Sequence, residues 1–388
     1  MKINRGLFAR LRSALASPKN ASAIEPGKAG SIAETIHRAL AKAGLETPSA
    51  ATQGWPGTNR RVPDAAPRAG LFADLEAGRA RKAQNPGGLD DRDAGSPRGE
   101  FLSRSFSNDA GTRAYKLYVP SNYASTAMTR VPLVVMLHGC TQSPDDFAAG
   151  TRMNALAERH GFLVAYPAQA ANANGSRCWN WFRGQDQSRD RGEPALIAGI
   201  TREVATNYRI DEARIFVAGL SAGAAMSVIL GAEYPELYAA VGAHSGLPQG
   251  AAHDVASAFG AMKGGPATAR RSRADDAAAP GSQPLVPTIV FHGDADQTVV
   301  PRNGDAIVEQ AGVAADSRLI ASVKRGGSAD GRGYTRTVYT DDGGNPRLEH
   351  WVLHGAGHAW SGGSAEGSYT DANGPDASAE MVRFFLRS

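Results

Sequence analysis

The sequence predicts an α/β protein whose central sheet is mainly parallel and covered by helices on both faces. Apolar runs such as 132–137 and 287–292 have the length of strands and lack polar alternation, which is typical of strands covered on both sides. Stretches with helical spacing of apolar residues alternate with these runs over about 110–388. At 214–231 one apolar run passes directly into an Ala-rich helical stretch. This alternation favours a layered α/β domain.

The order of elements follows from these patterns and from local start and stop signals. Residues 115–119 alternate like an edge strand. Ser143 is expected to cap a helix over 143–160, with Asp146 completing a capping box and Gly161 ending the helix. Further strands are expected at 132–137, 162–166, 215–218, 238–243, 287–292, 334–340 and 348–353, further helices at 195–208, 222–230, 255–262, 303–311 and 377–386, and a surface insertion at 264–284.

The strand-to-helix junction contains a G-x-S-x-G pattern centred on Ser221. A buried strand that turns at once into a helix forces the serine into a tight elbow, where its hydroxyl stands clear of the sheet. Gly219 and Gly223 remove side chains that would collide at such a turn. The serine is therefore a candidate nucleophile, and the alternative is a helix-capping serine between two turn glycines.

A serine nucleophile needs a base, and the base needs an acid partner. The loop after the buried strand 287–292 offers Asp296, with Asp294 as the competing aspartate. The loop after the last strand offers His358, and we expect His354 to be a packed or hydrogen-bonded histidine. The chain order Ser221, Asp296, His358 is the order of an α/β-hydrolase, so the sequence predicts that fold.

The oxyanion hole of such a site needs two amide donors. We expect them from Ala222, which follows the serine, and from Cys140, in the loop after the first central strand. The aromatic segment 178–182 suggests an apolar wall for a substrate chain, with a satellite core under a long loop as the alternative. Cys140 and Cys178 are the two cysteines, and pairing between them stays open because a reducing cytosol would oppose it.

The composition fits one globular catalytic domain, residues 101–388, behind a basic N-terminal region. The chain has 388 residues and a net charge of +4. Residues 1–100 hold 16 Lys and Arg against 10 Asp and Glu, whereas the rest holds 26 against 28. Two cysteines are too few for a Cys-ligated zinc site, and no metal, cofactor or nucleic-acid partner is expected. No run of 18 apolar residues occurs, so no transmembrane segment is expected.

The N-terminal region, 1–100, is expected to be mostly disordered with short amphipathic helices near 1–19 and 31–43. Arg10 and Arg12 interrupt the first apolar segment, so no Sec signal peptide is predicted. This basic segment could lie on a lipid or polymer surface. A marginal helix in solution and a transit peptide are the alternatives.

The segments LHGCTQS (137–143), CWNWF (178–182), GLSAGAAM (219–226), FHGDADQTV (291–299) and GAGHAWSGG (355–363) together resemble the poly(3-hydroxybutyrate) depolymerase family of α/β-hydrolase esterases. The resemblance covers about residues 110–388. It implies Ser221, Asp296 and His358 as the triad and the Cys140 and Ala222 amides as the oxyanion hole. It also implies Trp179 and Trp181 near the polyester and supports a Cys140–Cys178 disulfide.

The resemblance implies a serine esterase that cleaves poly- or oligo-(3-hydroxybutyrate) through an acyl-enzyme. Without a recognised export signal or separate polymer-binding domain, the chain looks more like the intracellular members, which predicts a cytoplasmic, granule-associated protein. Its basic N-terminal segment would then contact the polyhydroxybutyrate granule surface. The alternatives are a feruloyl or acetylxylan esterase, and a non-enzymatic granule-coating protein that keeps a hydrolase shell.

Overall fold

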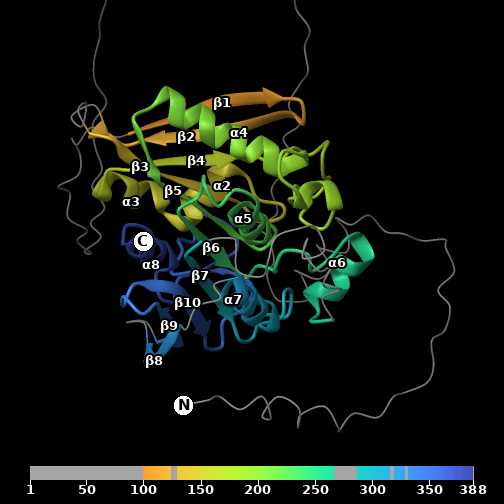
Figure 1. Ribbon diagram of the computed structural model, residues 1–388, viewed down its shortest axis with the longest axis vertical. Coiled ribbons are helices and arrows are strands. Elements are labelled where there is room, and N and C mark those ends of the chain that lie inside the picture. The colour runs from red at the N-terminus through yellow and green to blue at the C-terminus, as the bar shows by residue number, and fades with distance from the viewer. Residues whose placement is uncertain (1–98, 124–128, 266–285, 315–318, 328–330, 388) are drawn as a thin grey trace, which may run out of the picture.

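The computed structural model describes residues 99–123, 129–265, 286–314, 319–327 and 331–387 (Figure 1). The expectations for the basic N-terminal region, including its helices and its granule contact, lie outside the described residues. The same holds for most of the expected insertion at 264–284.

The described strands form one ten-stranded sheet and one short two-stranded sheet. Their bounds are β1 Glu100–Asn108, β2 Gly111–Val119, β3 Val131–Leu137, β4 Leu163–Pro167, β5 Ile210–Leu220, β6 Ala240–His244, β7 Thr288–Gly293, β8 Ile320–Gly327, β9 Gly333–Thr340, β10 Pro346–Leu353, β11 Trp360–Ser361 and β12 Thr370–Asp371. The large sheet has the order β1-β2-β4-β3-β5-β6-β7-β10-β9-β8 (Figure 1). Its six inner strands, from β4 to β10, are parallel, and antiparallel strands extend both ends. The predicted mainly parallel sheet is confirmed.

Helices cover both faces of this sheet, as the sequence predicts. The described helices are α2 Pro144–Thr151, α3 Met153–His160, the 3-10 helix η2 Gly184–Gln187, α4 Gly192–Asn207, α5 Ala222–Glu233, α6 Val255–Met262, α7 Arg302–Ala314 and α8 Ala377–Phe385. Side chains of α4 and α5 share one hydrophobic core with one face of the sheet, and those of α2, α3 and α8 share a second core with the other face.

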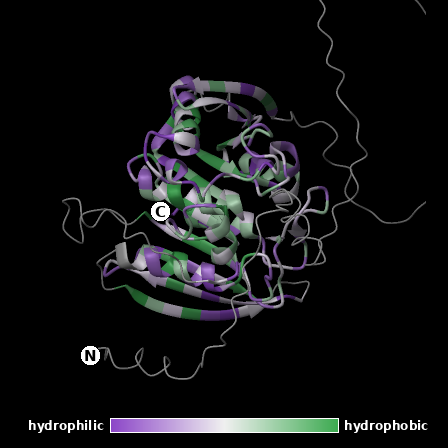
Figure 2. Cartoon of the chain, turned by 90° about the vertical axis from the view of Figure 1, so that its right-hand side faces the viewer, coloured by the Kyte–Doolittle hydropathy of each residue, from purple (hydrophilic) through white to green (hydrophobic). Residues whose placement is uncertain are grey.

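Strand β3 shows how the sequence builds two cores at once. Leu133, Val135 and Leu137 belong to the core under α4 and α5, whereas Val134 and Met136 belong to the core on the opposite face. Alternating side chains of a strand point to opposite faces, so an uninterrupted apolar run fits a strand that is covered twice. In Figure 2 the hydrophobic residues accordingly concentrate along the central strands.

Two expectations about the elements are wrong, and two strands of the large sheet were not predicted. The helix expected over 143–160 is two helices, because Arg152 adopts a left-handed conformation (φ 54°) between α2 and α3. Strand β2 is not at the edge, since it pairs with both β1 and β4. Strands β1 and β8 escape the sequence analysis because most of their residues are exposed and no apolar run marks them.

The carboxyl ends of the parallel strands lie at one edge of the sheet. The loops that follow β3, β7 and β10 leave from this edge, and β5 there passes into α5. Ligands of open α/β sheets bind outside the carboxyl ends of the strands. The topology therefore gathers the predicted site segments on one side of the molecule.

Candidate active site

Ser221 lies in a strained elbow between β5 and α5. Its backbone angles are φ 57° and ψ −118°, an uncommon conformation for a residue with a side chain. The start of α5 packs closely against the ends of β3 and β5. A Cβ on Gly223 would lie 2.1 Å from the Leu137 carbonyl oxygen, and a Cβ on Gly219 would lie 2.5 Å from the Gly223 backbone. The Ser221 amide donates a 2.9 Å hydrogen bond to the His244 carbonyl. The junction thus has the geometry that the sequence predicts for it.

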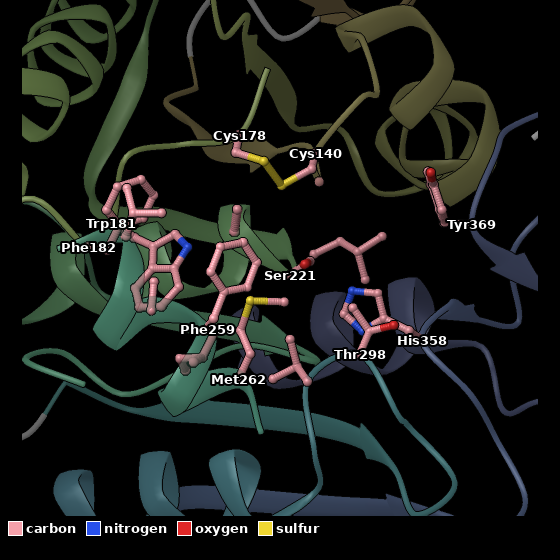
Figure 3. A pocket seen from close by; sticks show the side chains of 17 residues that line it. Cys140, Cys178, Trp181, Phe182, Ser221, Phe259, Met262, Thr298, His358 and Tyr369 are labelled. Atoms are coloured by element: carbon pink, nitrogen blue, oxygen red, sulfur yellow. A yellow bond between two sulfur atoms is a disulfide. The ribbon is translucent and has the colours of Figure 1, made fainter. Parts of the chain in front are cut away.

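Asp296 and His358 form a hydrogen-bonded pair in the same region. Nδ1 of His358 lies 2.7 Å from Oδ2 of Asp296, and both residues are buried. The other carboxylate oxygen of Asp296 accepts hydrogen bonds from the amides of Thr298 (2.8 Å) and Val299 (2.9 Å). His358 and Ser221 line one pocket (Figure 3). The loops after β7 and β10 therefore bring an acid and a base to the serine's pocket.

The charged form of Asp296 is favoured although the residue is buried. Burial by itself raises the pKa of the Asp296 carboxyl. The neighbouring His358 and His292 and the amide donors lower it by more, so the pKa lies below its ordinary value. Nε2 of His292 donates to the Val299 carbonyl (2.8 Å) and lies 3.6 Å from Oδ2 of Asp296. A carboxylate held between two imidazoles is suited to stabilise a positive charge on His358.

The competing aspartate and histidine form a separate pair. Nδ1 of His354 lies 2.9 Å from Oδ2 of Asp294, whose other oxygen accepts from the Gly355 amide (2.7 Å). Their side chains are 45% and 41% exposed, and neither residue lines the pocket. This pair ties the loops after β7 and β10 together, as expected of a hydrogen-bonded His354.

Two further histidines are buried. His350, in β10, lies near Asp305, with 3.9 Å between Nδ1 and Oδ1 of the carboxylate. Nε2 of His244 accepts a hydrogen bond from the Ser361 amide (3.1 Å), and burial lowers the pKa of this histidine to about 3. Neither lines the pocket that contains Ser221.

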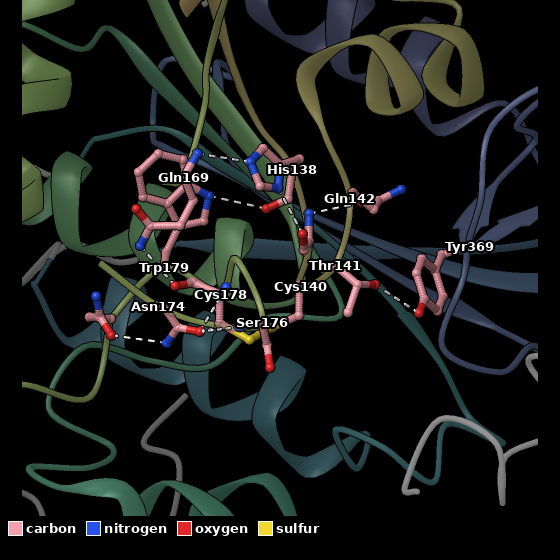
Figure 4. The surroundings of a disulfide bond; sticks show 12 residues. His138, Cys140, Thr141, Gln142, Gln169, Asn174, Ser176, Cys178, Trp179 and Tyr369 are labelled. Carbon is pink, nitrogen blue, oxygen red and sulfur yellow. Dashed lines mark hydrogen bonds between the residues drawn. A yellow bond between two sulfur atoms is a disulfide. The ribbon is translucent and has the colours of Figure 1, made fainter. Parts of the chain in front are cut away.

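The loop after β3 is braced by its own side chains (Figure 4). Nε2 of His138 accepts from the Gln169 amide (3.1 Å), so Nδ1 carries the proton and donates to the Gly139 carbonyl (2.7 Å). Burial lowers the pKa of His138 to about 4, which keeps the ring neutral. The Gly139 amide donates to Oε1 of Gln142 (2.9 Å). His138 thus holds the loop rather than exchanging a proton with substrate.

The predicted oxyanion donors flank the pocket. Both Cys140 and Ala222 line it together with Ser221. Ala222 is the first residue of α5, and the first amides of a helix have no partner within the helix. Among the described residues the Cys140 amide donates no hydrogen bond outside regular elements. Both residues therefore line the pocket of the serine, and among the described residues neither amide has an acceptor of its own.

Cys140 and Cys178 form a disulfide in the structure (Figure 4). The bridge joins the loop after β3 to the aromatic segment 178–182. A second tie is the hydrogen bond from the Thr141 amide to the Ser176 carbonyl (2.7 Å). The two segments consequently behave as one wall of the site.

The prediction for Trp179 is wrong in one respect, because its side chain does not reach the pocket. Trp179 is fully buried, and its indole N–H donates to the His138 carbonyl (3.1 Å), so it supports the loop after β3 from behind. Trp181 does line the pocket, and Phe182 lies beside it in an edge-to-face arrangement. The apolar wall is thus formed by Trp181 and Phe182.

Other residues of the pocket were missed by the sequence analysis. Helix α6 contributes an apolar stripe that includes Phe259 and Met262, and Tyr369 closes the opposite side (Figure 3). The stripe on α6 has helical spacing and was therefore detectable as an amphipathic face. Tyr369 lies in no recognisable motif, and only the fold brings it near Thr141. The two hydroxyl oxygens are 3.0 Å apart.

Within the part of the chain that the structure describes, no group of three or more His, Cys, Asp and Glu is arranged to hold a metal ion. In the same part, none of the helices has the length and apolar character needed to cross a bilayer.

Comparisons with known proteins identify esterases to which this chain is similar. Residues 113–329 match the family described as Esterase PHB depolymerase. The chain is 32% identical over 262 residues to poly(3-hydroxyalkanoate) depolymerase C of Paucimonas lemoignei, covering 65% of this chain and 60% of that protein. It is 30% identical over 206 residues to the probable acetylxylan esterase A of Aspergillus fumigatus, covering 51% and 53%. The chain thus spans a little over half the length of these relatives.

The fold has a counterpart among solved structures. The acetyl xylan esterase from Aspergillus awamori superposes with a TM-score of 0.57 at 21% identity, covering 75% of this chain and all of that one. This likeness supports the α/β-hydrolase fold predicted from the chain order of the site residues. The match of the family model over more than half of the chain, together with the fold, shows that this chain belongs to the PHB depolymerase family of esterases.

Proposed function

We propose that the protein is a serine ester hydrolase in which Ser221 is the nucleophile, His358 the base and Asp296 the acid. The observation that carries the proposal is the buried Asp296–His358 pair opening into the pocket of the elbow serine. A serine hydroxyl is a weak nucleophile alone, and a histidine with a fixed tautomer activates it. The accepting carboxylate keeps the proton on Nδ1, which leaves Nε2 free to take the serine proton.

The reaction proceeds through an acyl-enzyme. Oγ of Ser221 attacks the ester carbonyl carbon, its proton passes to His358, and the carbonyl oxygen becomes an oxyanion. The amides of Cys140 and Ala222 stabilise this charge, an effect worth about 10²–10³ in kcat for each donor. The C–O bond to the alcohol breaks as His358 protonates the departing oxygen. Water, deprotonated by His358, then attacks the acyl-enzyme and releases the acid.

Poly- or oligo-(3-hydroxybutyrate) is the substrate that we propose. The pocket is lined mainly by apolar side chains, and none of the described residues that line it is Asp, Glu, Lys or Arg. A polyester offers methyl groups and ester carbonyls, which match such a lining, whereas a sugar needs many hydrogen-bond partners. The relationship to a poly(3-hydroxyalkanoate) depolymerase supports the same choice.

A carbohydrate esterase is the second candidate. It is favoured by the acetylxylan esterases among the relatives and by the superposition on the acetyl xylan esterase of Aspergillus awamori. An acetyl group is small enough for an apolar pocket, and the sugar would then lie outside it.

Product analysis separates the two candidates. The full chain is incubated with amorphous poly(3-hydroxybutyrate), 3-hydroxybutyrate oligomers and acetylated xylan, and released 3-hydroxybutyrate and acetate are quantified. The Ser221→Ala variant measures the background. Our proposal predicts serine-dependent release of 3-hydroxybutyrate, and serine-dependent release of acetate alone would favour the second candidate.

The basic N-terminal segment provides a separate proposal, that it attaches the protein to the polyester granule surface within the cell. Residues 1–19 carry five Lys and Arg and no acidic residue, together with regularly spaced apolar residues. Removing residues 1–20 and following the protein on isolated granules tests the idea. Unchanged attachment of the shortened chain would overturn it.

A further inference from the structure

Glu193, near the start of α4, is a buried acidic residue that the proposed reaction does not use. It is only 3% exposed. Arg113 of β2 lies beside it, with 3.4 Å between Nη2 and Oε1. Burial, together with the neighbouring Asp186, raises the pKa of the Glu193 carboxyl above its ordinary value. A buried ion pair is weak evidence for a contribution to stability, so the other contacts of Glu193 are the informative ones.

The carboxylate of Glu193 accepts hydrogen bonds from the aromatic segment 178–182. Its Oε2 accepts from the backbone amide of Asn180, and its Oε1 accepts from Nδ2 of the same residue, both at 2.7 Å. Asn180 is buried and directly precedes Trp181 in the chain. Both oxygens of one carboxylate therefore fix the residue that leads into the aromatic wall.

A further hydrogen bond attaches the far end of this segment to the same residue. Asp186, in η2, is buried, and its Oδ1 accepts from the Glu193 amide (2.8 Å). The chain between these two attachments contains Trp181 and Phe182, which line the pocket of Ser221. Residue 193 therefore holds the chain on both sides of the two aromatic rings.

Gln169 connects Glu193 to the neighbouring loops. Its Nε2 donates to Oε1 of Glu193 and also to the Cys178 carbonyl (2.8 Å). Its backbone amide donates to Nε2 of His138 (3.1 Å), so Gln169 lies between the loop after β3 and the aromatic segment (Figure 4). The bonds to Cys178 and His138 do not involve Glu193. A change at Glu193 should therefore act mainly on the aromatic wall and leave the loop after β3 supported.

We propose that Glu193 is a positioning residue that holds Trp181 and Phe182 at the pocket by accepting the hydrogen bonds of Asn180. The inference rests on the proposed function, because it assumes that an ester reacts at Ser221. It adds that a carboxylate outside the pocket determines how tightly the ester is bound. An apolar wall contacts the ester alike in the ground state and the transition state, so displacing it should raise KM and leave kcat nearly unchanged.

The test is Glu193→Gln, which keeps the shape of the side chain but replaces one acceptor oxygen by a donor. Because both oxygens accept from Asn180, the new NH₂ group meets an N–H of that residue in either orientation. A buried donor without an acceptor is costly, so the wall should shift. We expect KM for p-nitrophenyl butyrate to rise about tenfold and kcat to stay within about threefold of the parent. A folded Glu193→Gln with the KM of the parent overturns the proposal.

Glu203→Gln is the matched control. Glu203 lies on the same helix, accepts a hydrogen bond from the Tyr115 hydroxyl (2.7 Å) and does not line the pocket. The oxygen of the new amide can still accept this bond, so KM and kcat should both match the parent. Equal increases of KM in the Glu203 and Glu193 variants would indicate a general effect on α4 and would overturn the proposal.

Asn180→Ala tests the same contact from its other side and leaves Glu193 opposite Arg113. It removes the Nδ2 donor, so KM should again rise. In the double variant with Glu193→Gln the two increases should not multiply, because both changes remove one shared interaction. Increases that multiply overturn the proposal. Thermal melts by circular dichroism establish which variants fold. If Glu193→Gln does not fold, an unchanged KM in folded Asn180→Ala overturns the proposal.

Failure of the proposed function gives a different result. If the parent hydrolyses the butyrate ester but releases no 3-hydroxybutyrate from oligomers, only the polyester assignment fails, and the comparison of KM values still decides the role of Glu193. If the parent hydrolyses none of these esters, both are overturned. An active parent whose folded Glu193→Gln variant keeps its KM overturns the role of Glu193 alone.

Discussion

Replacing Asp296 by asparagine tests the acid assignment sharply, because the surrounding hydrogen bonds fix how the new amide would sit. In the native site Oδ1 accepts from the Thr298 and Val299 amides at 2.8 and 2.9 Å, and Oδ2 lies 2.7 Å from Nδ1 of His358. The amide oxygen of asparagine would keep the two backbone donors, since its NH₂ group has no proton acceptor there. The NH₂ group would therefore face His358.

This orientation inverts the tautomer of the base. An NH₂ group donates, so Nδ1 of His358 would have to accept, and the ring proton would move to Nε2. Nε2 is the atom that must take the proton of Ser221, so the base would be blocked. A wrong tautomer of this kind lowers kcat by about 10⁴ in Ser-His-Asp enzymes. The fold itself should persist, because the substitution conserves shape and retains the two backbone hydrogen bonds.

The assay is kcat for p-nitrophenyl butyrate, with Asp294→Asn as the matched control. That residue lies two positions away, bonds to His354 at 2.9 Å, is 41% exposed and lies outside the pocket. We expect its kcat to stay within about threefold of the parent. A larger loss in Asp294→Asn than in Asp296→Asn would refute the assignment, and so would an Asp296→Asn variant with nearly normal kcat.

Three further predictions follow from the packing and charges of the site. Gly223→Ala should destabilise the protein by about 1–3 kcal/mol in denaturant unfolding, because the new Cβ would lie 2.1 Å from the Leu137 carbonyl oxygen; unchanged stability would contradict this crossing. Cys178→Ser removes the disulfide that fixes the position of the Cys140 amide. We expect kcat to fall by a factor of up to about 10², with a smaller change in KM. An unaltered kcat would show that the disulfide does not position this oxyanion donor. Burial lowers the pKa of His138 to about 4 and of His244 to about 3, below the ordinary value of about 6.5. As the pH falls, the two histidines take up protons in the unfolded chain before they do so in the folded protein. The free energy of unfolding should therefore decrease as the pH falls from about 6.5 toward about 4. A Tm that calorimetry finds constant over this range would contradict the prediction.

The fold is predictable from the sequence where the apolar pattern of a segment matches its burial in the structure. Buried parallel strands have continuous apolar runs, so the inner strands of the sheet were placed within a few residues. The elbow is visible as a strand run followed at once by a helix run, with glycines at 219 and 223. Asp296 was preferred over Asp294 from its place on the loop, and in the structure Asp296 is the aspartate that pairs with His358.

The errors share a physical cause, which is that the deciding contacts are distant in sequence. The break falls at Arg152 and not at the nearby Gly150, and the Arg152 side chain bonds to the Gly362 carbonyl (2.7 Å) and to Asp376 (3.2 Å). In the segment 178–182 no periodicity tells which aromatic faces inward, and Trp179 turns to the His138 carbonyl. Such choices depend on which partners the fold supplies.

The most direct test of the central claim is covalent labelling of the nucleophile. The full chain is treated with a fluorophosphonate, and the site of attachment is mapped by mass spectrometry in the parent, Ser221→Ala and His358→Ala. If Ser221 is the nucleophile and His358 its base, we expect one adduct on Ser221 in the parent and none at that position in Ser221→Ala. Labelling of Ser221 should be much slower in His358→Ala. Labelling of a different residue, or equally fast labelling of Ser221 without His358, would contradict it.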